Sequence, residues 1–278
     1  MTTTRLPDFE HTSVLGASLI LAFVLGQFID LPPRAVSFAF LDILVELTFD
    51  THSLLALMTA GLAIAGTAWL MGVHPSGKEV RGVQHWALPG MTAWVLSITI
   101  SSIPPGALWW VVLFAGTAFL VLVWIAEFIT VNPGDENFRL AANGLTVLSF
   151  ALYLVLTINL RAVGTRLIFL LPAVSLPVVV ITIRYLFLKL ESQDLLDAGN
   201  RSLSLLAAGT IGVAAGQFAT AFHYFPVSPL SFGLALLSPI YSANILFGNL
   251  VDARPAARTI AEPFVLLILI WTAAFLSQ

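Results

Sequence analysis

The sequence predicts an all-α, polytopic membrane protein, a single membrane-embedded bundle of about nine transmembrane helices over residues 1–278. Of these residues, 58% are hydrophobic and only 10% are charged, whereas a soluble domain usually carries about 25% charged residues. Apolar runs of about 20 residues, the length that a helix needs to cross the hydrocarbon core, also recur along the chain. Because lipid satisfies no backbone hydrogen bonds, these runs are expected to be helical.

Nine such segments fit between groups of turn-forming residues. Proline, often with glycine or asparagine, marks the joins near 31–33, 74–77, 103–106, 132–134 and 225–226. The join at 161–164 is the weakest of the series, and the third segment is the shortest. The predicted spans are residues 12–30, 53–72, 86–103, 107–130, 139–160, 165–188, 202–224, 229–250 and 259–277.

The segment Val36–Phe49 lies between the first two spans and is apolar but carries Asp42 and Glu46. It is too short to cross as a helix, so we expect an amphipathic helix on the outer surface. If it did cross, there would be ten spans and both termini would lie on the same side. Eight and ten spans are the alternatives to nine.

Basic residues indicate the orientation. With the N-terminus inside, nine lysine and arginine residues lie at inner loops or helix ends and three lie outside, which agrees with the positive-inside rule. We therefore expect a cytoplasmic N-terminus and a multi-pass protein of the cell (inner) membrane. The first apolar run lacks a cleavage site and is expected to be an uncleaved span.

A regular series of small residues occupies the seventh predicted span. Ala208, Gly212, Gly216 and Thr220 follow one another at every fourth position, so they make a smooth face where another helix can approach closely. That helix could belong to the same bundle or to another copy. The expected partners are the lipid bilayer and, at such a face, a second copy or another membrane protein. A net charge of −3 with scattered basic residues argues against nucleic acid.

Two groups of polar residues are candidates for chemistry. On the predicted outer side, Asp42, Glu46 and Asp50 recur at a spacing of four, His52 follows, and His223 is expected on the same side. These are candidate binding residues for a cation or proton, but the acidic series is also what the solvated face of an interfacial helix would show, and we favour that interpretation. We assign no metal site.

The second group lies at the predicted inner side. His74, His85 and Glu127 are candidate catalytic residues if the helices bring them together, and otherwise they are interfacial residues that reach toward lipid headgroups. Glu262 is a further carboxylate near the start of a span. No pattern predicts a cofactor.

Missing motifs narrow the function. The chain has no cysteine, no G-x-S-x-G, no H-E-x-x-H and no phosphate-binding glycine loop. We therefore expect a non-catalytic bundle for binding, assembly or permeation of an apolar or neutral solute. The alternative is a membrane-embedded enzyme that acts on a lipid-like substrate.

Overall fold

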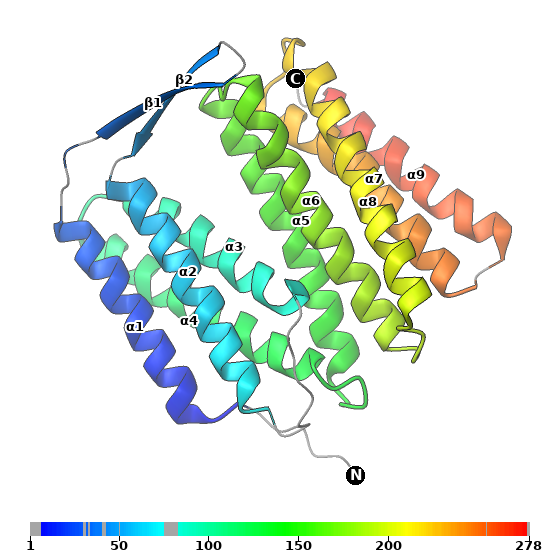
Figure 1. Cartoon of the computed structure of the whole chain (residues 1–278), viewed down its shortest axis with the longest axis horizontal. Helices are drawn as coiled ribbons and strands as arrows, with labels where there is room; N and C mark the ends of the chain where they lie inside the picture. The colour runs from blue at the N-terminus through cyan, green and yellow to red at the C-terminus, as the bar shows by residue number, and fades with distance from the viewer. Residues whose placement is uncertain are drawn as a thin grey trace. The chain divides into compact units, whose positions relative to one another are not determined.

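The structure is a computed structural model that describes residues 7–29, 32, 34–40, 43–49, 51–74, 83–253 and 255–276. These residues form nine helices and one two-stranded hairpin (Figure 1). In chain order the elements are α1 (Phe9–Phe28), β1 (Arg34–Phe40), β2 (Ile43–Phe49), α2 (Thr51–Gly72), α3 (Val83–Ser101), α4 (Ala107–Thr130), α5 (Phe138–Ala162), α6 (Leu167–Glu191), α7 (Ala198–His223), α8 (Pro229–Val251) and α9 (Ala256–Leu276).

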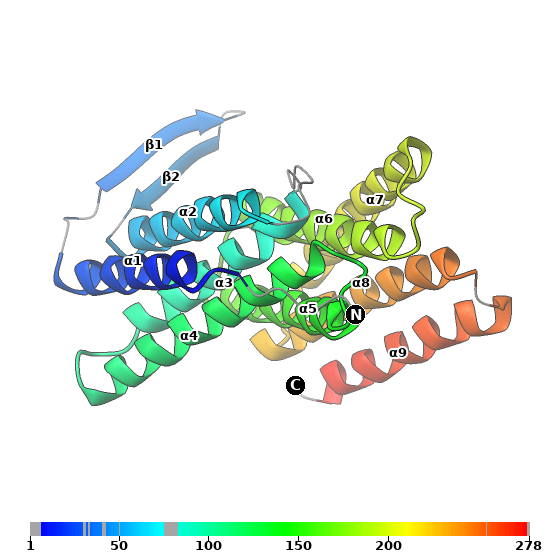
Figure 2. The same ribbon diagram turned by 90° about the horizontal axis from the view of Figure 1, so that it is seen from below.

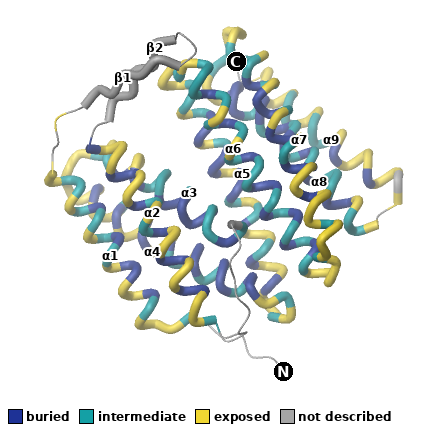
Figure 3. The backbone as a smooth tube through the Cα atoms, viewed as in Figure 1, coloured by how far each residue is buried: buried dark blue, intermediate teal, exposed yellow. Residues whose placement is uncertain are grey.

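The predicted fold class is confirmed, since each predicted span coincides with one helix. Eight of the helices are long and apolar enough to cross a membrane. The ninth, α3, is 19 residues long and carries polar residues that include Gln84 and His85. Along each helix, buried and exposed positions alternate at helical spacing (Figure 3). Because the exposed positions include many leucines and phenylalanines, they suit contact with lipid rather than water.

The expected outer amphipathic helix at Val36–Phe49 is wrong, because this segment is an antiparallel hairpin. Its pairing runs from Arg34 opposite Phe49 to Phe40 opposite Ile43. Large apolar residues alternate with small or polar ones along β1, and β-branched and aromatic residues are frequent in both strands. A period of two favours a strand over a helix. Seven residues per strand are also too few to cross a membrane, so the ten-span alternative has no support here.

The chain divides into two compact units, Met1–Ala141 and Ala142–Gln278. The expectation of a single domain over 1–278 stays a prediction. Unit 1 contains α1 to α4 and the hairpin, which connects α1 to α2. In this unit α3 packs against α2 and α4, and α1 packs against α2 and α4 (Figure 2). A buried hydrogen bond of 2.9 Å from Trp124 Nε1 to Thr67 Oγ1 joins α4 to α2.

Unit 2 contains most of α5 and all of α6 to α9. Close packing of α6 and α7 depends on glycine: a Cβ at Gly212 would meet Val179 and would lie 3.3 Å from the Ser175 carbonyl oxygen, and a Cβ at Gly216 would lie 2.8 Å from Ser175 Oγ. The α5–α6 join, 163–166, is a glycine cap. Gly164 has φ +70°, which L side chains rarely adopt, and closes α5.

Prolines inside the helices of unit 2 do not break them. Pro172 and Pro177 lie within α6, and Pro239 lies within α8. A proline cannot donate to the carbonyl four residues earlier, so Pro239 frees the carbonyl of Ala235. Trp271 on α9 donates its indole N–H to this oxygen at 3.0 Å. The neighbouring helix therefore replaces the lost hydrogen bond, as helices in membranes require.

A series of polar contacts joins α6 to α8. Asn244 Nδ2 donates to Thr182 Oγ1 at 3.2 Å, the Tyr185 side chain lies against Gly248, and Lys189 Nζ lies 2.9 Å from Asp252 Oδ2. These pairs are separated by three or four residues along both helices. The two helices therefore run parallel and remain in contact as far as their C-terminal ends.

Candidate functional site

In unit 1 the structure brings together two of the three candidate catalytic residues. His85 is the third residue of α3, and Glu127 lies one turn before the end of α4. The distance from His85 Nδ1 to Glu127 Oε2 is 3.1 Å, and both side chains are almost completely inaccessible, at 3% and 0% exposure. Thr130 Oγ1 is 3.4 Å from the same carboxylate oxygen. The result is a buried acid–base pair inside a helix bundle.

The third candidate, His74, lies just beyond the end of α2, close enough to His85 to interact with it electrostatically. It is partly buried, and its ring centroid lies 4.4 Å from that of Phe128, the residue that follows Glu127. Burial lowers the pKa of His74 below its ordinary value, and positive charge on His85 lowers it further. His74 is therefore mainly neutral near pH 7 and is electrostatically coupled to His85.

The candidate residues of the outer side are divided among several elements, and two of them lie outside the described residues. Asp42 and Asp50 lie outside the described residues, and Glu46 is in β2 opposite Ser37. His52 is an exposed residue of the first turn of α2 in unit 1. His223 ends α7 in unit 2, where its carbonyl accepts a hydrogen bond of 3.0 Å from Arg161. Binding by this group stays a prediction.

The described residues of this site differ from the geometry that a metal ion requires of its ligands. Among the described residues, no three histidine or carboxylate side chains are placed to hold one metal ion. His85 and Glu127 are therefore a hydrogen-bonded pair with His74 nearby, and the three side chains do not have the geometry of a metal site. This geometry allows proton exchange between the imidazole of His85 and the carboxylate of Glu127.

The small-residue series lies on the face of α7 toward α6. Ala208 is fully buried, and Gly212 and Gly216 are the positions where Ser175, Val179 and Leu171 of α6 approach closest. Thr220, one turn further, is partly buried and donates its hydroxyl to the Gly216 carbonyl at 2.9 Å. These contacts are within unit 2, so packing inside the chain accounts for the pattern.

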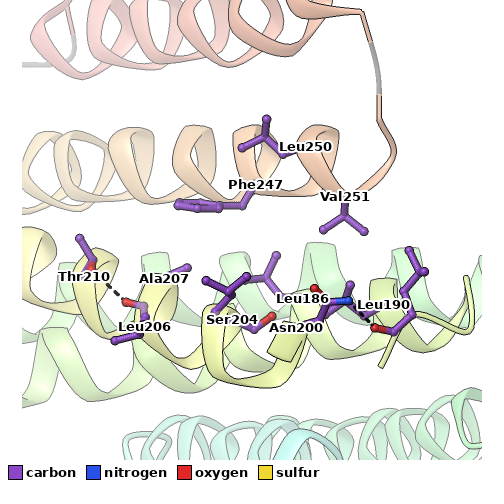
Figure 4. A pocket seen from close by; sticks show the side chains of 12 residues that line it. Leu186, Leu190, Asn200, Ser204, Leu206, Ala207, Thr210, Phe247, Leu250 and Val251 are labelled. Atoms are coloured by element: carbon purple, nitrogen blue, oxygen red, sulfur yellow. Dashed lines mark hydrogen bonds between the residues drawn. The ribbon is translucent and has the colours of Figure 1, made fainter. Parts of the chain in front are cut away.

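A cavity of about 590 Å³ opens at the other half of α7, between this helix and the ends of α6 and α8. Figure 4 shows Phe247, Leu250 and Val251 of α8 across from the α7 side chains. Its volume lies within the range of small-molecule sites. The lining residues are Leu186, Leu190, Leu195, Asn200, Leu203, Ser204, Leu206, Ala207, Thr210, Phe247, Leu250 and Val251.

This cavity has a buried floor and an exposed apolar rim. Leu186, Leu190 and Ser204 are buried. Leu203, Leu206 and Leu250 are 65%, 66% and 57% exposed. The polar groups are neutral and partly used locally: Asn200 Nδ2 donates to the Leu195 carbonyl at 2.8 Å, and Thr210 donates to the Leu206 carbonyl at 2.9 Å (Figure 4). An apolar ligand therefore fits this lining better than a charged one.

One buried charge was missed as a site residue by the sequence analysis. The side chain of Arg184 of α6 is only 2% exposed. Ionisable residues buried in membrane helices usually have a structural or transport role. The sequence feature that could have identified Arg184 is its position, seven residues before the end of the apolar helix α6. An arginine at this depth lies inside the span rather than at the membrane boundary.

The fold and its sites define a class: a polytopic helical membrane protein with a buried histidine–glutamate pair in one unit and an apolar cavity in the other. The chain belongs to the family described as proteins of unknown function, DUF5656, whose model matches residues 31–277. No curated protein and no solved structure matches the chain.

Proposed function

We propose that this protein is a non-catalytic membrane bundle that binds one apolar, lipid-like molecule in the cavity of unit 2. The observation that carries the proposal is the combination of an apolar cavity with an exposed leucine rim on spans α7 and α8. In a membrane this rim faces acyl chains rather than water. A hydrocarbon chain can then enter sideways from the bilayer without crossing a polar barrier.

The position of the cavity supports a chain held near one membrane face. It lies where α6 and α8 end and α7 begins, beside the Lys189–Asp252 ion pair. Charged pairs of this kind suit the headgroup region. We propose the cell membrane as the location and the cytoplasmic face as the side of this pair, because the basic residues favour an inner N-terminus.

Binding is preferred to catalysis for this cavity because of its lining. Its polar residues are Asn200, Ser204 and Thr210, which hold no proton that they exchange near neutral pH. An enzyme acting on a lipid would place an acid or base at the reacting bond. The enzyme alternative thus requires a different site, and detection of turnover in the experiment below would favour it.

Native mass spectrometry of the full chain, extracted gently from its own membrane, tests the proposal. The wild-type protein should retain one lipid-like molecule per chain, whose mass identifies it. Ala207→Trp places an indole in the cavity and should reduce retention about tenfold, equivalent to about 1.4 kcal/mol. Leu205→Trp is the matched control on the same helix, because Leu205 is exposed and does not line the cavity.

Equal retention by the wild type and by Ala207→Trp would contradict binding in this cavity, provided that both variants elute as folded protein. A lipid recovered in chemically altered form would move the assignment to an enzyme. A chain that carries no lipid but co-purifies with a protein partner would replace solute binding by assembly as the function.

A further inference from the structure

The buried pair in unit 1 requires an explanation that the cavity in unit 2 does not supply. Glu127 is fully buried in a span, where an isolated carboxylate is costly, most of all at the centre of the membrane. His85 offsets this cost at 3.1 Å by sharing or donating a proton. Together the two side chains can hold one proton with no net charge.

His74 gives this pair a neighbour at the end of the unit. It lies outside the helical spans, where the chain leaves α2, and its ring contacts Phe128 next to Glu127. Since its pKa is lowered by burial and by the charge of His85, His74 is mainly neutral at neutral pH and has a ring nitrogen able to accept a proton. A neutral, partly exposed imidazole beside a buried acid–base pair is the arrangement of a proton relay.

We propose that His85 and Glu127 form a proton-binding site inside unit 1, and that His74 is the group through which protons reach it from the adjacent membrane face. The pair is neutral when it holds one proton, as imidazolium with carboxylate or as imidazole with carboxylic acid. Loss of this proton leaves one negative charge, and uptake of a second leaves one positive charge. No other bond forms or breaks.

The other charged groups at this end of unit 1 are arranged differently. His11 lies 3.6 Å from Asp8 and stacks on Trp69, at a ring-centroid distance of 4.5 Å. Within the described part of the chain, the remaining charged residues there are Glu10 at the start of α1, Asp135 and Glu136 in the α4–α5 loop, and the exposed Arg139. Lys78, Glu79 and Arg81 lie outside the described residues. Glu127 and His85 are thus the buried pair of this end.

Nitrogen NMR of the histidine-labelled full chain in lipid bilayers tests the site. The chain has five histidines, so single histidine-to-glutamine variants assign each signal. A change of pH should add a proton to the wild-type pair or remove one, seen at the ring nitrogens of His85 or, with labelled glutamate, at the carboxyl carbon of Glu127. In Glu127→Gln the stabilising charge is lost, so neutral His85 should predominate where the wild type holds the proton.

His74→Gln tests the route. It should slow proton exchange at His85 about a hundredfold, the lower end of what a positioned proton-transfer group contributes. His11→Gln is the matched control, because His11 lies at the same end of unit 1 and should leave the rate unchanged. Equal exchange rates in these two variants would overturn the role of His74.

Unchanged signals of both the His85 ring nitrogens and the Glu127 carboxyl carbon over the whole pH range in the wild type would overturn the proton site itself and leave a structural hydrogen bond. This wild-type titration decides the question even where Glu127→Gln fails to fold. Lipid retention by unit 2 is a separate readout, so failure of either proposal is distinguishable from failure of the other.

Discussion

Buried polar side chains join the helices of this protein through hydrogen bonds. Trp124 donates to Thr67 across α4 and α2, and Trp271 donates to the carbonyl that Pro239 leaves free in α8. Because lipid provides no hydrophobic force between helices, such contacts and close packing hold the bundle together. Trp124 is fully buried.

At this scale the sequence could name His85 and Glu127 but could not pair them. They are separated by 42 positions, and their contact depends on which helices are neighbours. Two residues on different spans can meet or face opposite lipids with the same local sequence. Arg184 illustrates the same limit, because its burial depends on the surface of α6 that the neighbouring helices cover.

Removal of one buried hydrogen bond tests the residue-scale account. Thr67→Val keeps the shape of the side chain but leaves the indole N–H of Trp124 without its acceptor. The free energy of unfolding should fall by about 1 kcal/mol, within the range for buried groups left unsatisfied. Reversible unfolding in mixed micelles measures it, and Thr99→Val, whose hydroxyl is exposed and bonds only within α3, is the control. Equal stability of Thr67→Val and the wild type would contradict the prediction.

His74 predicts how stability depends on pH. Its pKa is lowered in the folded chain, so the unfolded chain takes up a proton first as the pH falls below about 6.5. Stability should therefore decrease through this range until the lowered pKa is reached. In His74→Gln the loss of Tm between pH 7.5 and pH 5.5, both about one unit from that value, should be smaller than in the wild type.

His52→Gln provides the control for this pH prediction, because His52 is exposed at the other end of α2. It should retain the acid sensitivity of the wild type. The same decrease in Tm for His74→Gln and His52→Gln would show that His74 does not cause the effect.

At the scale of elements, hydropathy predicts helices well and the hairpin poorly. An apolar run of about 20 residues has one stable backbone form in lipid, so the nine helices follow from local sequence. The segment Val36–Phe49 is shorter, and its carboxylates at a spacing of four resemble a helical face. Its alternation of large and small residues instead matches the β1–β2 pairing.

The contact of α6 with α7 can be tested at two glycines of one helix. Gly212→Val should destabilise the fold by about 1 to 3 kcal/mol, since its side chain would overlap Val179 and the Ser175 carbonyl. Gly209→Ala is the matched control, because a Cβ there meets nothing within 4 Å. It should be neutral or stabilising by up to about 1 kcal/mol. Unfolding of both variants in detergent measures the difference, and equal stability would contradict the account.

At the scale of the whole molecule, the number of helices follows from the sequence, but the role of α3 needs an experiment. Eight helices qualify as spans by length and hydropathy, and α3 carries the buried polar side chains of His85, Thr92 and Ser97. Its low hydropathy is consistent with a helix that is covered mainly by α2, α4 and α1. If the N-terminus is inside and α3 crosses, the loop before α4 lies outside and the loop after α4 lies inside. If α3 does not cross, these two loops exchange sides.

The chain contains no cysteine, so single cysteines report this topology cleanly. Ser102→Cys and Asn132→Cys place a thiol in the exposed loops on either side of α4. With nine spans and an inner N-terminus, an impermeant thiol reagent should label intact cells at position 102 and label position 132 only after permeabilisation. The opposite result would contradict a crossing α3 with an inner N-terminus, and labelling of both positions in intact cells would contradict the assignment of α4 as a span.

The central claim is that the cavity of unit 2 takes a lipid chain, and photocrosslinking in native membranes tests it most directly. A fatty acid with a diazirine near the end of its chain should react with cavity residues Leu206 of α7 and Phe247 of α8. These adducts should decrease in Ala207→Trp and persist in Leu205→Trp. Adducts spread evenly over the exposed leucines and phenylalanines of α7 and α9, unchanged by Ala207→Trp, would show general lipid contact and contradict the claim.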